Sequence, residues 1–299
     1  MDFSIIICTF NGSKRLPLSL ESIKRLVVPE KSTGELIVVD NNSTDRTRSV
    51  VESFGPDMPF PVRYCFEPLQ GLSYARNTGI KQAAGEVVVF TDDDCIVEPN
   101  WIVEILTEFR NDPDLMVLGG RVELYNKKDK PVTLRRLNEK RSFSSAIQTF
   151  TLLPGCNMAF RKVVSDTIGL FDVNYGAGRK IPSAEDSDFF YRAYGKGYKM
   201  AYFPNILIYH NHGRRTDMQV DKLTRGYVIG QGAFYCKHIF KGDFTAGHLF
   251  LIELKRNVKT ILLNFSHYQA AVKSFNRLCA LMTGFWYQLS VLLKKAKAR

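Results

Sequence analysis

The chain has 299 residues, of which 45% are hydrophobic and 24% are charged, and its formal net charge is +11. The first two values are ordinary for a globular protein of one or two domains, and they exclude a disordered or low-complexity chain. The six cysteines show neither metal-site spacing nor a paired pattern, so we expect reduced thiols in a cytosolic protein instead of a disulfide framework.

Three continuous apolar runs in the first third of the chain each end in polar side chains. Runs that are apolar at every position are typical of parallel strands buried on both faces. Ligands of open parallel sheets bind outside the carboxyl ends of the strands, so the polar side chains are predicted to share one crevice. The runs are residues 4–8, followed by Thr9, Asn11 and Gly12; residues 36–39, followed by Asp40, Asn41 and Asn42; and residues 87–90, followed by Thr91, Asp92, Asp93 and Asp94.

Helical periodicity fills the gaps between these strands. It predicts helices at residues 16–27, 44–54 and 71–84, with Gly85 closing the third at its C′ position. Pro99 is predicted to open a fourth helix. Because the chain enters its first strand at once, without a basic start, no signal peptide is expected.

The second half of the chain is less regular. The elements that we expect there are strand pieces at 115–118 and 121–124, a loop or short helix near the site at 127–141, a turn at Pro154-Gly155, a helix at 184–194, strands at 200–203 and 206–209, and helices from Tyr227 onward. The alternating strand–helix pattern followed by this mixed part predicts an α/β domain at residues 1–225 and a helical, amphipathic and basic extension at 226–299.

The acidic triplet Asp92–Asp94 is the most informative local feature. Three adjacent carboxylates repel one another unless a cation or a donor-rich ligand neutralises them. Mg²⁺ and Mn²⁺ prefer oxygen ligands and are typically held by one or two carboxylates plus substrate phosphates. The alternative is an acidic cap on the following helix, because acidic residues are common at helix N-termini.

Further candidate side chains lie at the ends of other elements. Asp40 suits hydrogen bonding to a base or ribose hydroxyl, although it also suits a turn. Arg76 on the 71–84 helix can pair with phosphate or remain a surface charge. Glu185 and Asp186 begin a helix, where they either complement the helix dipole or supply a general base. Of the two histidines in His210-Asn-His212, at least one is a candidate metal ligand.

These motifs together resemble glycosyltransferase family 2, of the bacterial polysaccharide or cell-surface glycan type, with the GT-A fold. That fold is a Rossmann-like mixed sheet flanked by helices. Residues 3–212 carry the resemblance, in the expected order. The matching blocks are the opening Ile-Cys-Thr-Phe-Asn-Gly, residues 38–45, residues 71–80, Phe90-Thr-Asp-Asp-Asp94, residues 154–160, residues 168–172 and residues 185–189.

The resemblance implies an inverting transfer of a sugar from a UDP- or GDP-sugar to a glycan or lipid-linked acceptor. A divalent metal, Mn²⁺ or Mg²⁺, would assist the transfer. Asp186 would be the catalytic base, with Glu185 beside it, and Asp93 is a variable middle position. The other implied roles are nucleotide binding by Thr9, Asn11, Asp40, Arg76 and Asp92; metal binding by Asp94 with His210 or His212; and sugar contacts by Gly155, Cys156 and Asn157.

Two other classes of protein compete with this interpretation. A nucleotidyltransferase of related fold would release pyrophosphate, but such enzymes usually open with a glycine-rich loop, where this chain has Thr9-Phe-Asn-Gly-Ser. A non-catalytic glycan-binding protein would not need the whole set of carboxylates. Nucleic acid is not expected as a partner, because no recognition motif accompanies the basic charge.

The C-terminal segment is predicted to be amphipathic and basic. From Leu251 to Arg299 it has nine lysines or arginines against one acid, Glu253. The uncharged run from Leu278 to Leu293 is shorter than the roughly 20 residues that span a bilayer. It therefore predicts either a helix docked on the protein or on a second subunit, or an interfacial helix on anionic lipid at the inner face of the cell membrane.

Overall fold

The computed structural model describes residues 1–263 and 268–297. The three continuous apolar runs form neighbouring parallel strands, as predicted, with a fourth strand at the edge. Side chains of β1 alternate between two cores: Ile5 and Ile7 pack on one face of the sheet and Ile6 on the other. The four strands, in spatial order, are β3 (Val62–Phe66), β2 (Gly34–Asp40), β1 (Phe3–Thr9) and β4 (Val87–Asp92).

The sheet continues beyond β4 with strands of mixed direction. Next to β4 lies β8, antiparallel to both of its neighbours, and then β6 and β9 pair in parallel. The short strand β5 pairs with β9 at the far edge, and β7 also pairs with β9. These strands are β8 (Asn157–Arg161), β6 (Leu115–Leu124), β9 (Lys199–His210), β5 (Cys95–Val97) and β7 (Arg141–Ser142).

Two pairs of predicted strand pieces are single strands in the structure. Residues 115–124 form one strand, β6, and residues 199–210 form β9. Their register shifts after Gly120, where Pro204, Asn205 and Ile206 of β9 have no register partners in β6. Proline cannot donate to the ladder, so a bulge at this point lets the strand continue. The sequence around Pro204 therefore predicted two separate strands, although the structure has one strand, β9, that bends there.

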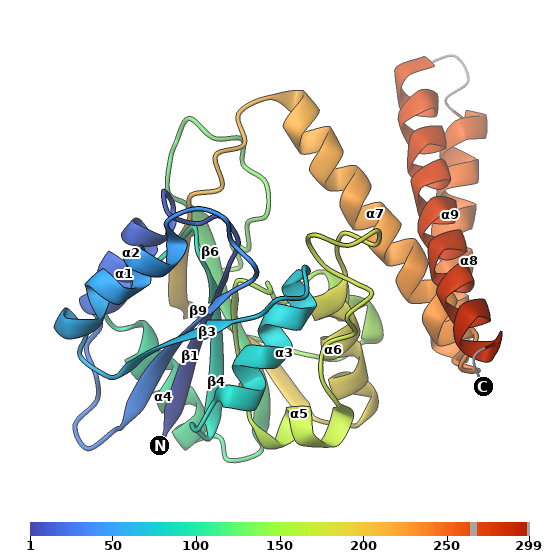
Figure 1. Ribbon diagram of the computed structural model, residues 1–299. Helices are drawn as coiled ribbons and strands as arrows, with labels where there is room; N and C mark the ends of the chain where they lie inside the picture. The colour runs from blue at the N-terminus through green and yellow to red at the C-terminus, as the bar shows by residue number, and fades with distance from the viewer. Residues whose placement is uncertain (264–267, 298–299) are drawn as a thin grey trace.

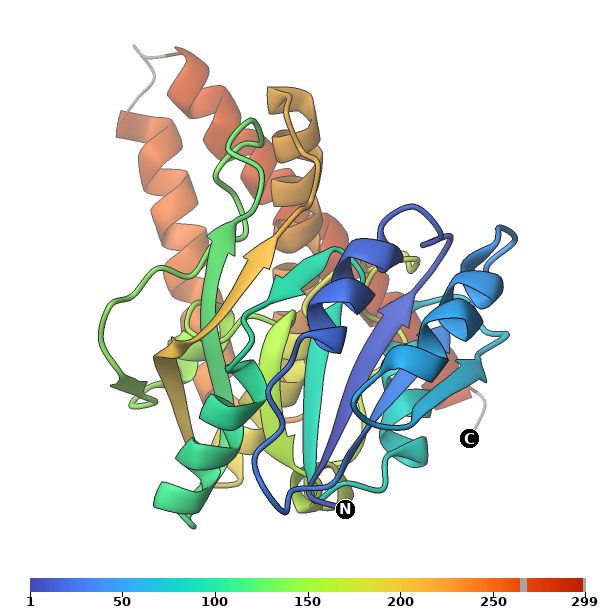
Figure 2. The same cartoon turned by 90° about the vertical axis from the view of Figure 1, so that its left-hand side faces the viewer.

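Helices cover both faces of the sheet, as the GT-A fold requires (Figures 1 and 2). Apolar residues of α1, α2 and α4 pack on one face. Those of α3, α5 and α6 pack on the other. The helices are α1 (Leu16–Lys24), α2 (Thr47–Phe54), α3 (Leu72–Gln82), α4 (Trp101–Asn111), α5 (Val163–Ile168) and α6 (Glu185–Gly195), with short 3₁₀ turns η1 (Gly55–Asp57) and η2 (Ala146–Phe150).

Several predicted helix ends were wrong, among them two that a glycine and a proline were expected to mark. Gly85 does not close α3 in a left-handed conformation; α3 ends at Gln82, and the next residue, Ala83, is extended. Gly85 is small for another reason: a Cβ there would lie 2.3 Å from the Phe3 carbonyl carbon. Similarly, α4 begins at Trp101, two residues after Pro99. The charged segment 127–141 contains no helix, and its Thr133 lines the cavity described below.

Three helices follow β9: α7 (Asp217–Ile239), α8 (Phe244–Leu263) and α9 (Tyr268–Lys297). They form a bundle beside the sheet domain (Figure 1). The predicted division at residue 225 falls inside α7, which is continuous; the division into two domains remains a prediction. Glycines let α7 and α9 cross closely, because a Cβ on Gly232 or Gly284 would overlap a backbone carbonyl oxygen of the other helix.

A buried charge network fixes α7 to the sheet domain. Asp188 on α6 accepts from Lys237 at 2.8 Å and from His238 at 2.9 Å, and Arg192 also pairs with it. Burial would raise the pKa of Asp188, but the Lys237 charge and these hydrogen bonds outweigh it and leave that pKa well below its usual range. Breaking a buried ion pair costs about 3–5 kcal/mol, so α6 and α7 are held as one unit.

Candidate active site

A cavity of about 1180 Å³ lies at the carboxyl ends of β1 and β4. Its walls come from both halves of the sheet, from the 150–156 segment, from the start of α6 and from the C-terminal helices. It gathers most of the predicted site residues, although they are far apart in the sequence. Those that line it are Thr9, Arg76, Asp92, Asp94, Gly155, Cys156, Glu185, Asp186 and His210.

The three aspartates of the triplet have different surroundings. Asp92 and Asp94 lie close to other side chains of the cavity lining: Asp92 is 4.0 Å from Arg76, and Asp94 is 3.2 Å from His210. Asp93 instead accepts a hydrogen bond from Thr9 Oγ1 at 2.6 Å and pairs with Arg15 at 2.9 Å. Asp92 and Asp94 are thus available to a ligand, whereas Asp93 is bonded to both ends of the loop between β1 and α1.

The electrostatics of the pair Asp94–His210 favour opposite charges. Burial alone would lower the pKa of His210, but its hydrogen bond to Asp94 and the nearby negative charges raise it to about 9. Burial would likewise raise the pKa of Asp94, but His210 outweighs it and lowers that pKa. Asp92 has less compensation, so burial raises its pKa to about 6, with Arg76 opposing the shift.

Thr133 orients His210, and sequence reasoning missed it. Its hydroxyl donates to the Val132 carbonyl at 2.6 Å and lies 3.1 Å from His210 Nδ1. Since that hydroxyl proton is already used, Nδ1–H is the donor and Nε2 faces Asp94. Thr133 has φ +61°, a left-handed conformation that is rare for a β-branched residue and costs on the order of 1–3 kcal/mol. A lone threonine in a charged loop gives no sequence signal of this role.

His212 is placed differently from His210. Its Nδ1 accepts the Arg214 backbone N–H at 3.0 Å, its ring packs edge-on to that of His210, and its Nε2 has no hydrogen-bond partner among the described residues. It does not line the cavity. His210 is therefore the histidine that the fold brings to Asp92 and Asp94.

Arg76 and Glu185 form a buried pair in the lining of the same cavity. Arg76 Nη1 donates to Glu185 at 3.0 Å, and the guanidinium also lies over the rings of Phe90 and Phe171. The second oxygen of Glu185 is buried without a partner among the described residues. This arrangement fixes Arg76, whose Nη2 donates to the Gly155 carbonyl at 3.4 Å and lies 4.0 Å from Asp92.

Asp186 lies in the first turn of α6, close to the turn that precedes β8. Its Oδ1 accepts the Ser187 backbone N–H at 2.7 Å. Its Oδ2 faces Gly155, where a Cβ would lie only 2.6 Å away. Glycine at this position therefore leaves room for a carboxylate that borders the cavity.

Besides His212, three predicted residues lie outside the cavity lining. Asp40 is nearly buried and accepts from Tyr64 Oη and Ser43 N, each at 2.8 Å. Asn11 accepts the Thr44 backbone N–H at 2.9 Å, which ties the first two loops together. Asn157 is the third; it accepts from the Trp101 indole at 2.9 Å and donates to two backbone carbonyls. Asn157 thus does not line the cavity, because its side-chain amide is bonded to α4, β6 and β9.

Several basic and aromatic side chains of the cavity were not predicted. Arg15 follows the first loop, and Arg214 has a buried Nη1 without a partner among the described residues. Tyr227 and Gln231 come from α7, and Arg277 comes from α9, where it pairs with Glu253 of α8 at 2.8 Å. No motif surrounds these residues; Tyr227, Gln231 and Arg277 reach the cavity only through the packing of the C-terminal helices.

The part of the cavity lined by Asp92, Asp94 and His210, which we call the acidic wall, fits a divalent cation. Asp92, Asp94, Cys95 and His210 each offer one ligand atom, and these atoms lie within 4.8 Å of one another. Carboxylate and imidazole ligands suit Mn²⁺, and carboxylates suit Mg²⁺. A cation would also stabilise the charged form of Asp92, whose pKa is raised by burial.

Glu185 makes the stability of the protein depend on pH. Burial raises its pKa to about 7, and the adjacent Asp186 charge adds to the effect, against about 4.3 in an unfolded chain. The corresponding stability is complete below pH about 4 and is lost as the pH rises through 7. Glu185→Gln should therefore raise the thermal unfolding midpoint at pH 8 and change it little at pH 5. Glu52→Gln, on an exposed face, is the control; parallel profiles for both variants would contradict the assignment.

Comparison with known proteins identifies the family. Residues 4–169, more than half of the chain, match the family model described as "Glycosyl transferase family 2". The fold and the cavity define an enzyme of the glycosyltransferase class, and the chain belongs to glycosyltransferase family 2.

Two relatives extend the match beyond the family segment. The glucosyl-dolichyl phosphate glucuronosyltransferase of Haloferax volcanii is 26% identical over 201 residues, which are 65% of this chain and 64% of the relative. The succinoglycan biosynthesis protein ExoM of Rhizobium meliloti is 27% identical over 215 residues, which are 70% and 66% of the two chains. The chain thus spans about two thirds of the length of each relative.

Solved structures show the same fold. The mannosyltransferase PcManGT from Pyrobaculum calidifontis, in complex with GDP-Man and Mn²⁺, aligns with a TM-score of 0.63 at 16% identity over 96% of this chain and 86% of that one. The S. aureus TarS fragment with UDP-GlcNAc aligns with a TM-score of 0.59 at 22% identity, over 77% and 66%. The nearly complete coverage by PcManGT includes the region of the C-terminal helices.

Proposed function

We propose that this enzyme transfers a sugar with inversion from a nucleotide-diphosphate sugar to a glycan or lipid-linked acceptor. One observation carries the proposal: the pair Asp94–His210 and the carboxylate of Asp186 line the same cavity. A leaving diphosphate and an attacking hydroxyl need such different partners on two sides of the reacting carbon. Neighbouring structures with UDP-GlcNAc and with GDP-Man and Mn²⁺ support the substrate class.

The residues divide the chemistry between them. The acceptor hydroxyl oxygen bonds to the anomeric carbon, the bond from that carbon to the phosphate oxygen breaks, and Asp186 takes the hydroxyl proton. Asp92, Asp94 and His210 would hold a divalent metal, which when bound offsets the charge of the departing diphosphate. Arg15 and Arg214 supply further positive charge at the same cavity.

Product analysis tests the reaction. Purified protein with Mn²⁺ and a panel of UDP- and GDP-sugars should release a nucleoside diphosphate, and the sugar product should have the anomeric configuration opposite to that of the donor. Release of pyrophosphate would overturn the reaction type. A product that keeps the donor's configuration would overturn the inverting mechanism alone.

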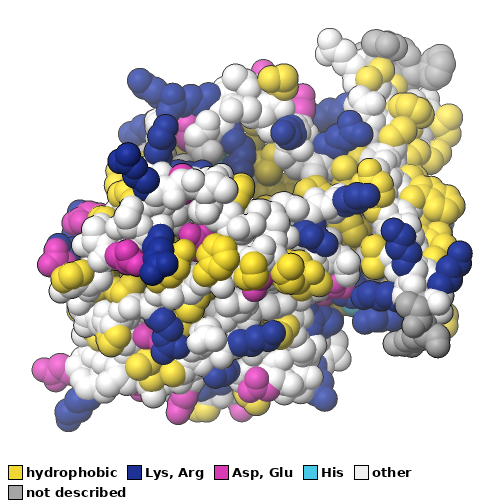
Figure 3. All heavy atoms as spheres, viewed as in Figure 1, with side chains coloured by type: hydrophobic (Ala, Val, Ile, Leu, Met, Phe, Trp, Pro, Cys, Tyr) yellow, Lys and Arg dark blue, Asp and Glu magenta, His cyan; other side chains and the backbone are white. Residues whose placement is uncertain are grey.

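The C-terminal helices supply a surface for a membrane. Within residues 1–263 and 268–297, no helix has both the length and the hydrophobicity to cross a bilayer. Hydrophobic side chains nevertheless gather over α8 and α9 (Figure 3), and Trp286 is 60% exposed. We define the outer stripe as Leu251, Val258 and Leu262 on α8 and Phe275, Met282, Trp286 and Leu293 on α9; these positions recur every four or seven residues.

Docking on the protein and binding to lipid need different faces of α9. Ala280, Leu281 and Gly284 face α7, whereas the outer stripe faces away from it. Basic residues such as Lys255, Lys259, Lys294 and Lys295 accompany the stripe, and this combination suits an anionic lipid surface. We place the enzyme on the inner face of the cell membrane, beside a lipid-linked acceptor; the dolichyl phosphate named for the Haloferax relative supports that class.

Liposome flotation tests the lipid surface. The protein should float with anionic vesicles, less at high salt, and Phe275→Ser with Trp286→Ser should abolish flotation. Phe66→Ser, at the opposite edge of the sheet and equally exposed, is the matched control. Truncation after Ser274 is a poorer variant because it also uncovers α7. If the stripe instead pairs two copies of the chain, sedimentation will show a dimer that the double variant dissociates, without vesicle binding.

A further inference from the structure

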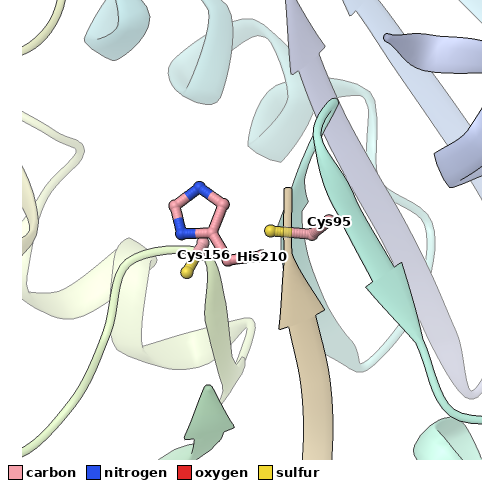
Figure 4. Close-up of side chains that lie close together, drawn as sticks. All are labelled: Cys95, Cys156 and His210. Carbon is pink, nitrogen blue, oxygen red and sulfur yellow. The ribbon is translucent and has the colours of Figure 1, made fainter. Parts of the chain in front are cut away.

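Two thiols lie beside the histidine of the acidic wall (Figure 4). Cys95 directly follows the aspartate triplet, and its backbone pairs with His210 across β5 and β9. Cys156 comes from the turn before β8. The sulfurs of Cys95 and Cys156 and a ring nitrogen of His210 all lie within 4.8 Å of one another. The three residues come from three separate parts of the chain, so the fold alone assembles the cluster.

The cluster is enclosed but reachable. All three residues are buried, yet Cys156 and His210 line the cavity, which gives an ion a path. Zinc–sulfur bonds of about 2.3 Å in a tetrahedral site separate two sulfurs by roughly 3.8 Å, so small side-chain movements suffice. Thr133 fixes the His210 ring from the Nδ1 side, as partners of ligand histidines commonly do.

Burial of a cysteine is by itself ordinary, because free cysteines often behave as small apolar core residues. Cys236 is an example: it is completely buried, and it belongs to no such cluster among the described residues. Cys95 and Cys156 differ in having each other, an imidazole and the Asp94 carboxylate at the wall of one cavity. Thiolates and imidazole select softer ions than carboxylates do.

We propose that Cys95, Cys156 and His210 form a second metal site, selective for thiophilic divalent ions such as Zn²⁺ and Cd²⁺. Binding releases the two thiol protons to solvent as the metal–sulfur bonds form. The thiophilic ion and a metal on Asp92 and Asp94 compete for His210, so the two sites exclude each other. This consequence rests on the proposed function, whereas thiolate binding itself does not. The enzyme is therefore blocked by Zn²⁺ in the part of the cavity that would hold the diphosphate.

Cadmium titration of the whole protein tests the site directly. One equivalent of Cd²⁺ should produce the ultraviolet sulfur-to-cadmium charge-transfer band, and the band should be lost in Cys95→Ser and in Cys156→Ser. Cys8→Ser is the matched control, because Cys8 lines the same cavity outside the cluster; it should keep the band. Absence of the band in the wild type, or its persistence in both cluster variants, would overturn the proposal.

Two further measurements keep the result interpretable. Circular dichroism checks folding, and if the fully buried Cys95→Ser is unstable, Cys156→Ser at the cavity wall decides. Electron paramagnetic resonance of Mn²⁺ reports on competition: Zn²⁺ should release Mn²⁺ from the wild type but not from Cys156→Ser. A cadmium band without any Mn²⁺ binding would leave the thiolate site standing and count against the proposed metal-assisted transfer.

Discussion

An Asp186→Asn enzyme is expected to bind the donor normally and to transfer sugar about 10²–10⁴ times more slowly. The amide keeps the size of the side chain and its acceptor oxygen for the Ser187 N–H, but it cannot take a proton from the acceptor hydroxyl. Donor affinity by calorimetry and initial transfer rates measure the two effects separately.

The control for this variant is Asp217→Asn. Asp217 also lies in the first turn of a helix, α7, but it is exposed to solvent. It should keep full transfer activity, so a loss in both variants would point to helix stability instead of proton transfer. Full activity in Asp186→Asn would end the assignment of this residue as the base.

Asp94→Ala should abolish Mn²⁺-dependent binding of the nucleotide sugar. The variant removes the carboxylate nearest to His210, and the donor's phosphates then lose their counter-charge. Calorimetry with and without Mn²⁺ measures this dependence. Unchanged affinity with unchanged metal dependence would show that Asp94 is not a ligand.

The triplet itself offers the matched control. Asp93 is adjacent in sequence and has the same charge, but its oxygens are engaged by Thr9 and Arg15. Asp93→Asn should therefore retain metal-dependent donor binding. If Asp93→Asn and Asp94→Ala lose it equally, the net charge of the triplet matters more than the geometry of one carboxylate.

The parallel half of the sheet was predictable because its signals are local. The strands β1, β2 and β4 each have an apolar run and a polar end within a dozen residues, and with the edge strand β3 they lie in the order β3-β2-β1-β4. The mixed half was not, because β6 and β9 pair across some 80 residues and bend at a bulge. No sequence signal near Pro204 indicates that β9 continues past this residue.

The candidate site was predictable to the same extent. Asp94 and His210 follow strands, so the rule for strand ends led to both. The roles of Thr133 and Arg277 could not be predicted from the sequence. Thr133 contacts His210 from a strained loop, and Arg277 is brought to the cavity by the crossing of α7 and α9. For Asn157, the motif gave no sign of the partners that its amide has in the structure, and its contact with a sugar remains a prediction.

The position of β5 at the sheet edge has a consequence for folding. Cys95–Val97 follow β4 by two residues, yet their ladder partner, Ile208–His210, comes more than one hundred residues later. During synthesis the N-terminal part emerges first, so the strands that carry the aspartates can pair long before His210 exists. Contacts so distant in sequence also close slowly, because the loop entropy must be overcome first. The edge that brings His210 beside Asp94 and Cys95 is therefore expected to be the last part of the sheet to assemble, both on the ribosome and on refolding.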